Sequence, residues 1–320
     1  MRILIALDGS SSSDAVMQEA VKRPWPAGSE FAVVGVVDPY FFSKTPSLLD
    51  ELKQSTQRSL EEQAKLLAEA GWQVSPNVIL DNPRHALLRA AEQWTADLIL
   101  MGSHGRGAVG RLLVGSTVQA VMRHAECSVE IVRSSPDRDL AHGMRVLVPT
   151  DGSDHTEAAL RLVANQPWPK QSEFKLISIP EYPALVGEYP YYSPEQLAEL
   201  TRCGRTQAGA AAKSGGELLA KVGLTTTCVV AEPKETIARS ILAIAEEWKA
   251  DLIVLGSRGR RGFDRLIMGS VSETVALHAK CSVEVVRMHQ RHCNSAHPSS
   301  AEWPVPTHTY ARENKGITDA

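Results

Sequence analysis

The sequence contains no apolar run long enough to cross a membrane, and it carries little net charge. Its 320 residues include 34 Lys and Arg against 37 Asp and Glu, which gives a net charge of −3 at pH 7. A chain without an overall basic field is not expected to bind nucleic acid or an anionic membrane. Since 43% of the residues are hydrophobic and 22% are charged, we expect a soluble globular protein, and the length favours two domains.

The sequence also shows neither a signal-peptide pattern nor the cysteine pattern of a disulfide framework. The chain starts MRILIALDGS, which is typical of a strand and a turn, and it lacks the charged start, long apolar core and cleavage site of a signal peptide. A cytoplasmic location is therefore the default expectation. The five cysteines are an odd number and are widely scattered, which favours reduced thiols over a disulfide framework.

The sequence repeats itself. RILIALDGSSSSDA near the start matches RVLVPTDGSDHTEA in the middle, so Asp8 aligns with Asp151 (151 − 8 = 143). Later, ADLILMGSHGR matches ADLIVLGSRGR, so Gly102 aligns with Gly256 (256 − 102 = 154). The second copy has gained 11 residues (154 − 143 = 11), and we expect most of them in EYPALVGEYPYYSPEQ, where proline and tyrosine indicate a loop. The repeat predicts two tandem domains, at residues 1–135 and 144–288.

Each copy alternates strand and helix patterns. In the first copy, short apolar runs predict strands at 2–7, 31–37, 77–80, 97–101 and 128–132. Helices are predicted over 13–23 with Ser13 as N-cap, over 47–70, over 83–94 and from 116 onward. This alternation implies an α/β fold, with two tandem five-stranded parallel sheets covered by helices on both faces. Residues 134–143 are a predicted polar linker, and 289–320, polar and aperiodic, are a predicted disordered tail.

Glycine-rich stretches follow the fourth predicted strand of each copy. They read GSHGRGAVGRLLVGST and GSRGRRGFDRLIMGSVS. The first contains a G-x-G-x-x-G match, but the second copy breaks it and a dinucleotide fingerprint belongs after the first strand, so we interpret it as accidental. The Walker A pattern is absent. Both copies share the spacing G-x2-G-x9-G-S, formed by Gly102, Gly105, Gly115 and Ser116 and by Gly256, Gly259, Gly269 and Ser270.

The shared spacing suits a polyphosphate. The first two glycines allow a sharp turn at the carboxyl end of a strand and expose backbone N–H groups. The third glycine and its serine begin a helix, whose N-terminal N–H groups and dipole favour an anion. The alternative interpretation is a strand–helix connection without a ligand. In that alternative interpretation, Asp8 and Asp151 are turn residues or helix caps.

The chain resembles the universal stress protein family in its tandem form. In each copy the resemblance rests on the first-strand Asp, the ADLI-x2-GS-x-G segment, the glycine spacing and HA-x-CSVE-x-VR, and it covers nearly everything before the tail. It implies Rossmann-like domains of the adenine nucleotide alpha hydrolase type that bind ATP, with or without magnesium. In such family members the Asp contacts the nucleoside, the backbone after the second strand contacts the base, and the glycine loop holds the phosphates. The implied sites are Asp8, Val36, Gly102, Gly105, Gly115 and Ser116, and Asp151, Ile179, Gly256, Gly259, Gly269 and Ser270.

Three functions remain open. The leading hypothesis is an ATP-binding stress protein with a regulatory or protective role and no efficient catalysis, because no base paired with a nucleophile and no carboxylate cluster is evident. The alternatives are a slow ATP hydrolase or other nucleotide-processing enzyme, and an interaction module with a vestigial site. His124-x2-Cys127 and His278-x2-Cys281 could form a zinc site across a twofold axis, but a helix–strand corner fits them better.

The last strands, CSVEIV and CSVEVV, are short, apolar and nearly identical. As the last strand of each sheet, each presents an edge that can pair with another strand. The family resemblance implies a twofold contact through this edge. We therefore expect an antiparallel contact between 128–132 and 282–286 within one chain. A homodimer of the whole chain stays open.

Overall fold

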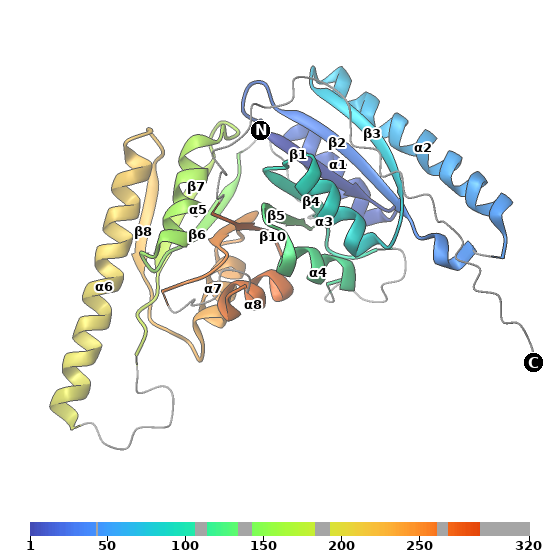
Figure 1. Ribbon diagram of the computed structural model, residues 1–320. Helices are drawn as coiled ribbons and strands as arrows, with labels where there is room; N and C mark the ends of the chain where they lie inside the picture. The colour runs from blue at the N-terminus through green and yellow to red at the C-terminus, as the bar shows by residue number, and fades with distance from the viewer. Residues whose placement is uncertain (43, 106–113, 134–142, 183–192, 261–267, 289–320) are drawn as a thin grey trace, which may run out of the picture.

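The computed structural model describes residues 1–42, 44–105, 114–133, 143–182, 193–260 and 268–288. Its strands form one ten-stranded sheet in the order β3-β2-β1-β4-β5-β10-β9-β6-β7-β8, with helices on both faces (Figure 1). The predicted linker, apart from Gly143, and the predicted tail lie outside the described residues, as does most of the loop expected to hold the insertion.

The first half of the sheet is wholly parallel, as the alternating pattern predicts. Its strands are β1 (Arg2–Leu7), β2 (Glu30–Val37), β3 (Gln73–Leu80), β4 (Leu98–Gly102) and β5 (Ser128–Val132). Its helices are α1 (Ser11–Lys22), the 3-10 helix η1 (Pro39–Phe42), α2 (Pro46–Glu69), α3 (Pro83–Gln93) and α4 (Ser116–His124). The α/β prediction is thereby confirmed.

The second half repeats this arrangement, again with parallel strands. Its strands are β6 (Arg145–Pro149), β7 (Glu173–Ser178), β8 (Thr226–Val230), β9 (Leu252–Gly256) and β10 (Ser282–Val286). Its helices are α5 (Asp154–Asn165), α6 (Pro194–Ala220), α7 (Ile237–Glu247) and α8 (Ser270–His278). None of the helices in the described ranges is long and apolar enough to cross a membrane.

Two local predictions were wrong. The N-cap of α1 is Ser10, and Ser13 lies inside the helix, where its hydroxyl bonds to Asp8 instead of capping the first turn. β3 begins at Gln73, earlier than the predicted start at Asn77, and it contains Pro76. A proline is tolerated there because β3 lies at one end of the sheet order, where one side of the strand has no ladder to maintain.

The predicted pairing of the last strands is confirmed. β5 and β10 are antiparallel neighbours in the middle of the sheet, with Val283 opposite Ile131 and Glu284 opposite Glu130 (Figure 1). Beyond the ladder, the Arg133 N–H donates to the Ser282 hydroxyl at 3.1 Å. The two halves therefore share one continuous sheet.

A reciprocal pair of arginines strengthens this junction. Arg133 of the first half donates from Nη2 to the Ala276 carbonyl near the end of α8, at 2.6 Å. Arg287 of the second half donates from Nη2 to the Met122 carbonyl near the end of α4, at 2.8 Å. A cation at a helix C-terminus satisfies carbonyls that lack a partner within the helix and interacts favourably with the helix dipole. Each half thus caps a helix of the other.

The apolar cores differ between the two faces of the sheet. On one face, side chains from α3, α4, α7 and α8 form a single core that continues across both halves. On the other face there are two separate cores, one beneath α1 and α2 and the other beneath α5 and α6. The boundary between the halves is therefore apolar on the first face only.

Candidate functional site

The expected site residues meet at the carboxyl ends of the strands. In each half the strand order reverses direction beside the first strand, so β1 lies between β2 and β4, and β6 lies between β7 and β9. Ligands of open parallel sheets bind at such a reversal. Leu7 is opposite Gly35 of β2, and Ala6 is opposite Met101 of β4. This register places Asp8 beside the start of the glycine loop.

One oxygen of each aspartate shapes the turn into the following helix. Asp8 Oδ1 accepts from the Ser10 N–H at 3.0 Å and from the Ser13 hydroxyl at 2.9 Å. Asp151 Oδ1 accepts from the Ser153 N–H at 2.9 Å and from the Thr156 hydroxyl at 3.1 Å. A carboxylate that accepts from the N–H two residues on forms an Asx-turn. Both aspartates therefore form Asx-turns at the start of the following helix.

The other oxygen of each aspartate faces the glycine loop. A Cβ added at Gly105 would lie 2.5 Å from Asp8 Oδ2, and one added at Gly259 would lie 2.7 Å from Asp151 Oδ2. In the second half, Asp151 Oδ2 also accepts from the Arg260 N–H at 2.9 Å. A side chain at the second glycine of the motif would therefore collide with the carboxylate that follows the first strand.

The hydrogen bonds determine the ionisation of Asp151. Burial raises the pKa of this carboxyl group, but hydrogen bonds from Ser153, Arg260 and Thr156 favour the anion and hold the pKa below its ordinary value. Asp151 is therefore ionised at neutral pH. It contributes an anionic acceptor for the loop N–H and not a proton donor.

The first glycine of the motif has a packing role that sequence reasoning missed. A Cβ at Gly102 would lie 2.6 Å from the Ser12 Cβ in α1, and a Cβ at Gly256 would lie 2.6 Å from the backbone carbonyl of His155 in α5. Neither glycine has a positive φ. The prediction of a sharp turn does not explain their presence, which follows instead from the close approach of the first helix to the strand end.

Replacing Gly256 with alanine should destabilise the protein by about 1–3 kcal/mol, because the added methyl group meets backbone atoms of α5 that cannot rotate away. The measurement is the urea midpoint of the full chain. Gly209→Ala is the matched control, since a Cβ at Gly209 in α6 meets nothing within 4 Å. This control should stabilise the helix slightly. Equal midpoints for the two variants would contradict the packing role.

The third glycine and its serine begin a helix in each half, as predicted. Gly115 is the N-cap of α4 and Gly269 is the N-cap of α8. Their N–H groups donate to the carbonyls of Ser103 and Ser257, both at 2.9 Å, so the ends of each loop are fixed to one another. Ser116 and Ser270 follow on the exposed side. A glycine N-cap has no side chain to satisfy the first-turn N–H groups, which leaves them suited to an anion.

The other predicted site residues are Val36 and Ile179, which lie near the ends of the second strand of each half. Val36 and Ile179 are half-buried and pack against the shared core, at and just beyond the ends of β2 and β7. Among the arginines of the glycine loops, Arg260 donates from its Nη1 to Gln207 of α6 at 2.8 Å. Arg106, Arg111, Arg261 and Arg265 lie outside the described residues.

A histidine lies beside the same serine in both halves, although the two histidines come from different elements. His104 Nδ1 is 2.8 Å from the Ser103 hydroxyl, and His155 Nδ1 is 3.5 Å from the Ser257 hydroxyl. Burial and the nearby Arg258 lower the pKa of His155, so that imidazole is neutral at pH 7. The alignment of the two copies does not pair these histidines, because His155 stands where the first copy has Ser12.

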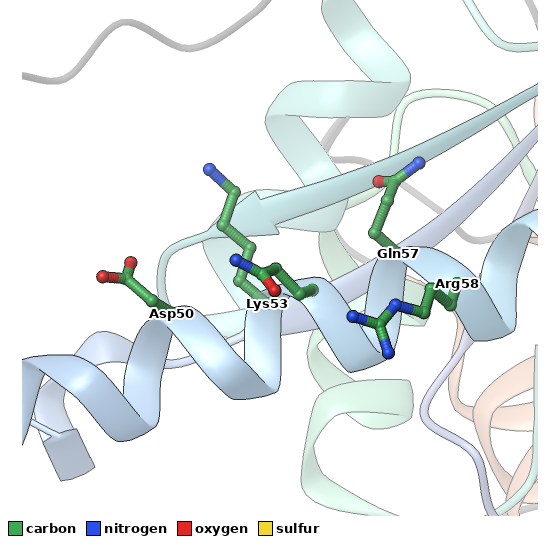
Figure 2. A pocket seen from close by; sticks show the side chains of 5 residues that line it. Asp50, Lys53, Gln57 and Arg58 are labelled. Carbon is green, nitrogen blue, oxygen red and sulfur yellow. The ribbon is translucent and has the colours of Figure 1, made fainter.

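The described residues form no metal site, and the surface pocket that the structure contains on α2 lies apart from the glycine loops. Within the described ranges, no group of three or more His, Cys, Asp or Glu side chains could hold a metal ion. His124 ends α4 and buried Cys127 immediately precedes β5, which confirms the helix–strand corner. Figure 2 shows a surface pocket elsewhere, lined by Asp50, Lys53, Gln54, Gln57 and Arg58, all on α2. Because one helix supplies its whole lining, it is a surface hollow separate from the glycine loops.

Comparison with known proteins agrees with the repeated geometry. The profile of the universal stress protein family matches residues 1–133 and 144–287. A universal stress protein of Mycolicibacterium smegmatis is 26% identical over 297 residues, covering 89% of this chain and 96% of the relative. One from Mycobacterium tuberculosis is 26% identical over 315 residues, with the same coverage. The crystal structure of a universal stress protein from Archaeoglobus fulgidus is similar in fold, with a TM-score of 0.64 at 23% identity over 89% of this chain and 98% of that one.

Proposed function

Because the chain belongs to the universal stress protein family, we propose that each half binds ATP at the carboxyl edge of its sheet and that the protein has a regulatory or protective role without efficient catalysis. The observation that carries the proposal is the repeated geometry. In both halves an aspartate lies against the glycine loop, the loop ends are fixed together, and a glycine–serine pair begins a helix without a side-chain cap. The two copies differ elsewhere but keep this arrangement. A shared ligand explains this better than a strand–helix connection without a ligand does.

The triphosphate fits the glycine loop and the helix start. In the first half, the phosphates would bind the backbone at Gly105 and Gly115 and the hydroxyl of Ser116, where the helix dipole favours negative charge. In the second half, Gly259, Gly269 and Ser270 would do the same. The base would lie against the backbone near Val36 or Ile179, and the nucleoside near Asp8 or Asp151.

Magnesium, if it accompanies ATP, would be held chiefly by the phosphates. Asp8 and Asp151 lie against the loops, and both already accept hydrogen bonds from the turn. Mg²⁺ usually binds proteins through one or two carboxylates together with substrate phosphates and water. The donor set present is compatible with that mode and supplies no all-protein cage.

Native mass spectrometry of the purified full chain tests the proposal. We expect a mass increase of one or two ATP molecules that disappears on denaturation, and that returns when ATP is added to protein stripped of ligand. A protein that neither carries nor takes up a nucleotide would favour the interaction module.

A slow ATP hydrolase is the second candidate, and the serine–histidine pairs are the observation that favours it. We expect turnover far below the enzyme median of about 10 per second, because Ser103 and Ser257 are buried. Phosphate release with magnesium should be unchanged by His104→Asn and His155→Asn. A fast rate that these variants abolish would establish an enzyme.

A further inference from the structure

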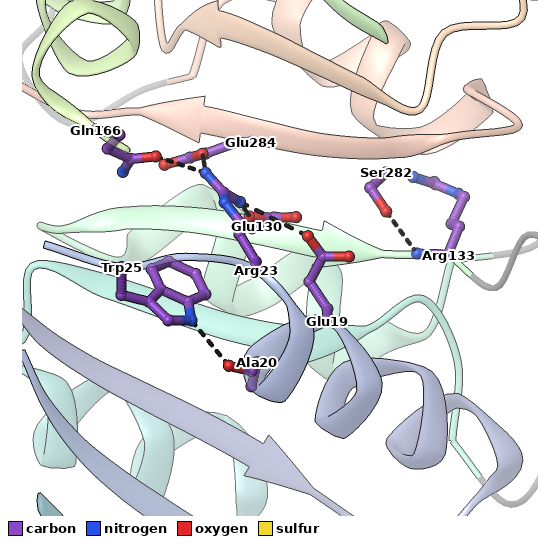
Figure 3. Close-up of polar contacts among 9 residues, drawn as sticks. All are labelled: Glu19, Ala20, Arg23, Trp25, Glu130, Arg133, Gln166, Ser282 and Glu284. Atoms are coloured by element: carbon purple, nitrogen blue, oxygen red, sulfur yellow. Dashed lines mark hydrogen bonds and ion pairs between the residues drawn. The ribbon is translucent and has the colours of Figure 1, made fainter. Parts of the chain in front are cut away.

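A buried ionic cluster lies at the junction of the two halves, on the face where the apolar cores are separate. Figure 3 shows its members, Glu19, Arg23, Glu130, Gln166 and Glu284, which we call the junction cluster. Arg23 directly follows α1 and is 1% exposed, while Glu130 of β5 and Glu284 of β10 are fully buried. Arg23 Nη1 lies 2.7 Å from Glu130 Oε2, and its Nη2 lies 3.5 Å from Glu284 Oε2.

Two tryptophans enclose the guanidinium group. The Arg23 Cζ is 4.8 Å from the ring centroid of Trp25 and 5.0 Å from that of Trp168. Each indole N–H donates at 2.8 Å to a carbonyl near the end of α1 or α5, which fixes the ring. Cation–π contacts of this kind stabilise the cation but supply no negative charge. The two rings therefore cover the guanidinium group with apolar surface.

The repeat is broken at this cluster. Glu130 and Glu284 occupy equivalent positions and lie opposite each other in the β5–β10 ladder. Arg23 has Gln166 as its counterpart (166 − 23 = 143), and Glu19 has Leu162 (162 − 19 = 143). The groups that face Glu284 are thus Arg23 and Glu19 from the α1 segment, Glu130 from β5, and the neutral Gln166 from the α5 segment. One cation meets three carboxyl groups.

We propose that the junction cluster binds one proton at neutral pH, on the Glu130–Glu284 pair, and that loss of this proton weakens the contact between the two halves. Two ionised carboxylates facing each other in a buried site repel, and a single guanidinium that already bonds closely to Glu130 cannot neutralise both. Protonation of one carboxyl group removes the repulsion between Glu130 and Glu284 and keeps the Arg23–Glu130 pair intact.

Glu284 is the carboxyl group that holds the proton. It lies farther from Arg23 than Glu130 does, at 3.5 Å against 2.7 Å, so the cation favours its ionised form less. Burial raises the pKa of Glu284; Arg23 opposes this rise and Glu19 adds to it. Because the proton belongs to the pair, its removal is a single step shared with Glu130.

The direction of the pH dependence follows from the raised pKa. A carboxyl group whose pKa is higher in the folded chain stabilises it fully below the ordinary value of 4.5. That stabilisation is lost as pH rises, until Glu284 ionises in the folded protein as well. Over this window the unfolding equilibrium constant should increase by up to about tenfold per pH unit.

The test compares the full-length wild type with Glu284→Gln by urea unfolding from about pH 6 to about pH 9. The amide imitates the protonated carboxyl group, and Gln166 shows that an amide oxygen can accept from Arg23 here, at 2.5 Å. We expect the variant to lose the extra pH dependence and to exceed the wild type in stability at the alkaline end. Glu217→Gln, the same change at an exposed position of α6, should keep the wild-type profile.

Infrared spectroscopy of the protonated carboxyl group gives an independent measurement. The wild type at neutral pH should show a buried carboxylic acid band that is absent from Glu284→Gln and from Glu130→Gln, since either change leaves a single carboxyl group at the β5–β10 ladder and removes the facing pair. Equal pH profiles for wild type and Glu284→Gln, or a wild type without the band, would overturn the proposal. Failure of Glu284→Gln to fold at any pH would also contradict it, because a neutral side chain should be tolerated.

Discussion

Replacing Arg23 with methionine should lower the free energy of unfolding by about 3–5 kcal/mol at neutral pH, because it leaves buried carboxylates without their cation. Methionine preserves most of the volume between Trp25 and Trp168, so the loss reports charge more than packing. Part of the loss should be recovered on acidification, as the remaining carboxyl groups take up protons. Urea unfolding of the full chain at neutral and mildly acidic pH measures both effects.

The control for this prediction is Arg161→Met in α5, which removes an arginine whose ion pair with Glu157 is exposed. Exposed pairs contribute little to stability, so this variant should unfold close to the wild type at both pH values. If Arg23→Met is no more destabilised than the control, or if its loss does not depend on pH, the electrostatic account of the junction is wrong.

Replacing Gly115 with valine should abolish ATP binding in the first half while the fold remains intact. A Cβ at Gly115 would have no neighbour closer than the His104 Cα at 3.8 Å, which is ordinary van der Waals contact. The branched side chain would occupy the space where a phosphate must approach the backbone. We expect a loss of at least about 100-fold in affinity at this site, equivalent to about 2.7 kcal/mol.

Thr117→Val is the matched control for this substitution. It introduces the same side chain two residues later, and the second half already has Val271 at the equivalent position. ATP binding should be unchanged in this variant. If Thr117→Val and Gly115→Val weaken binding equally, the effect comes from the helix and not from the approach of the phosphate.

The architecture could be predicted from the sequence because the same order of strand and helix patterns occurs in both copies. Periodicity within one copy indicates strands and helices, and the second copy shows which residues recur, including the edge strands that pair through Ile131 and Val283. The same reasoning misplaced the start of α1. Ser10 and Ser13 are both chemically suitable caps, and only the position of Asp8 distinguishes them.

The junction cluster illustrates what could not be predicted. The sequence contains a signal, since a glutamate stands in the middle of each of the apolar strands SVEIV and SVEVV, and an arginine precedes PWP in one copy only. The partners are 107 and 261 residues apart along the chain. Their contact depends on the antiparallel register and on the ends of α1 and α5. A pattern read along the chain does not contain that information.

The glycine loops show a similar limit. Spacing identified Gly102 and Gly256, but their requirement comes from the approach of α1 and α5, which is a tertiary contact. His155 was missed for the same reason, since it reaches Ser257 from a helix that is distant in the sequence.

An equilibrium titration of ATP by calorimetry, on protein stripped of ligand, tests the central claim most directly. We expect two ATP molecules per chain for the wild type, one for Gly115→Val, and none when Gly269→Val is added to it. A wild type without saturable ATP binding, or a double variant that still binds two, would contradict the assignment of the glycine loops as nucleotide sites.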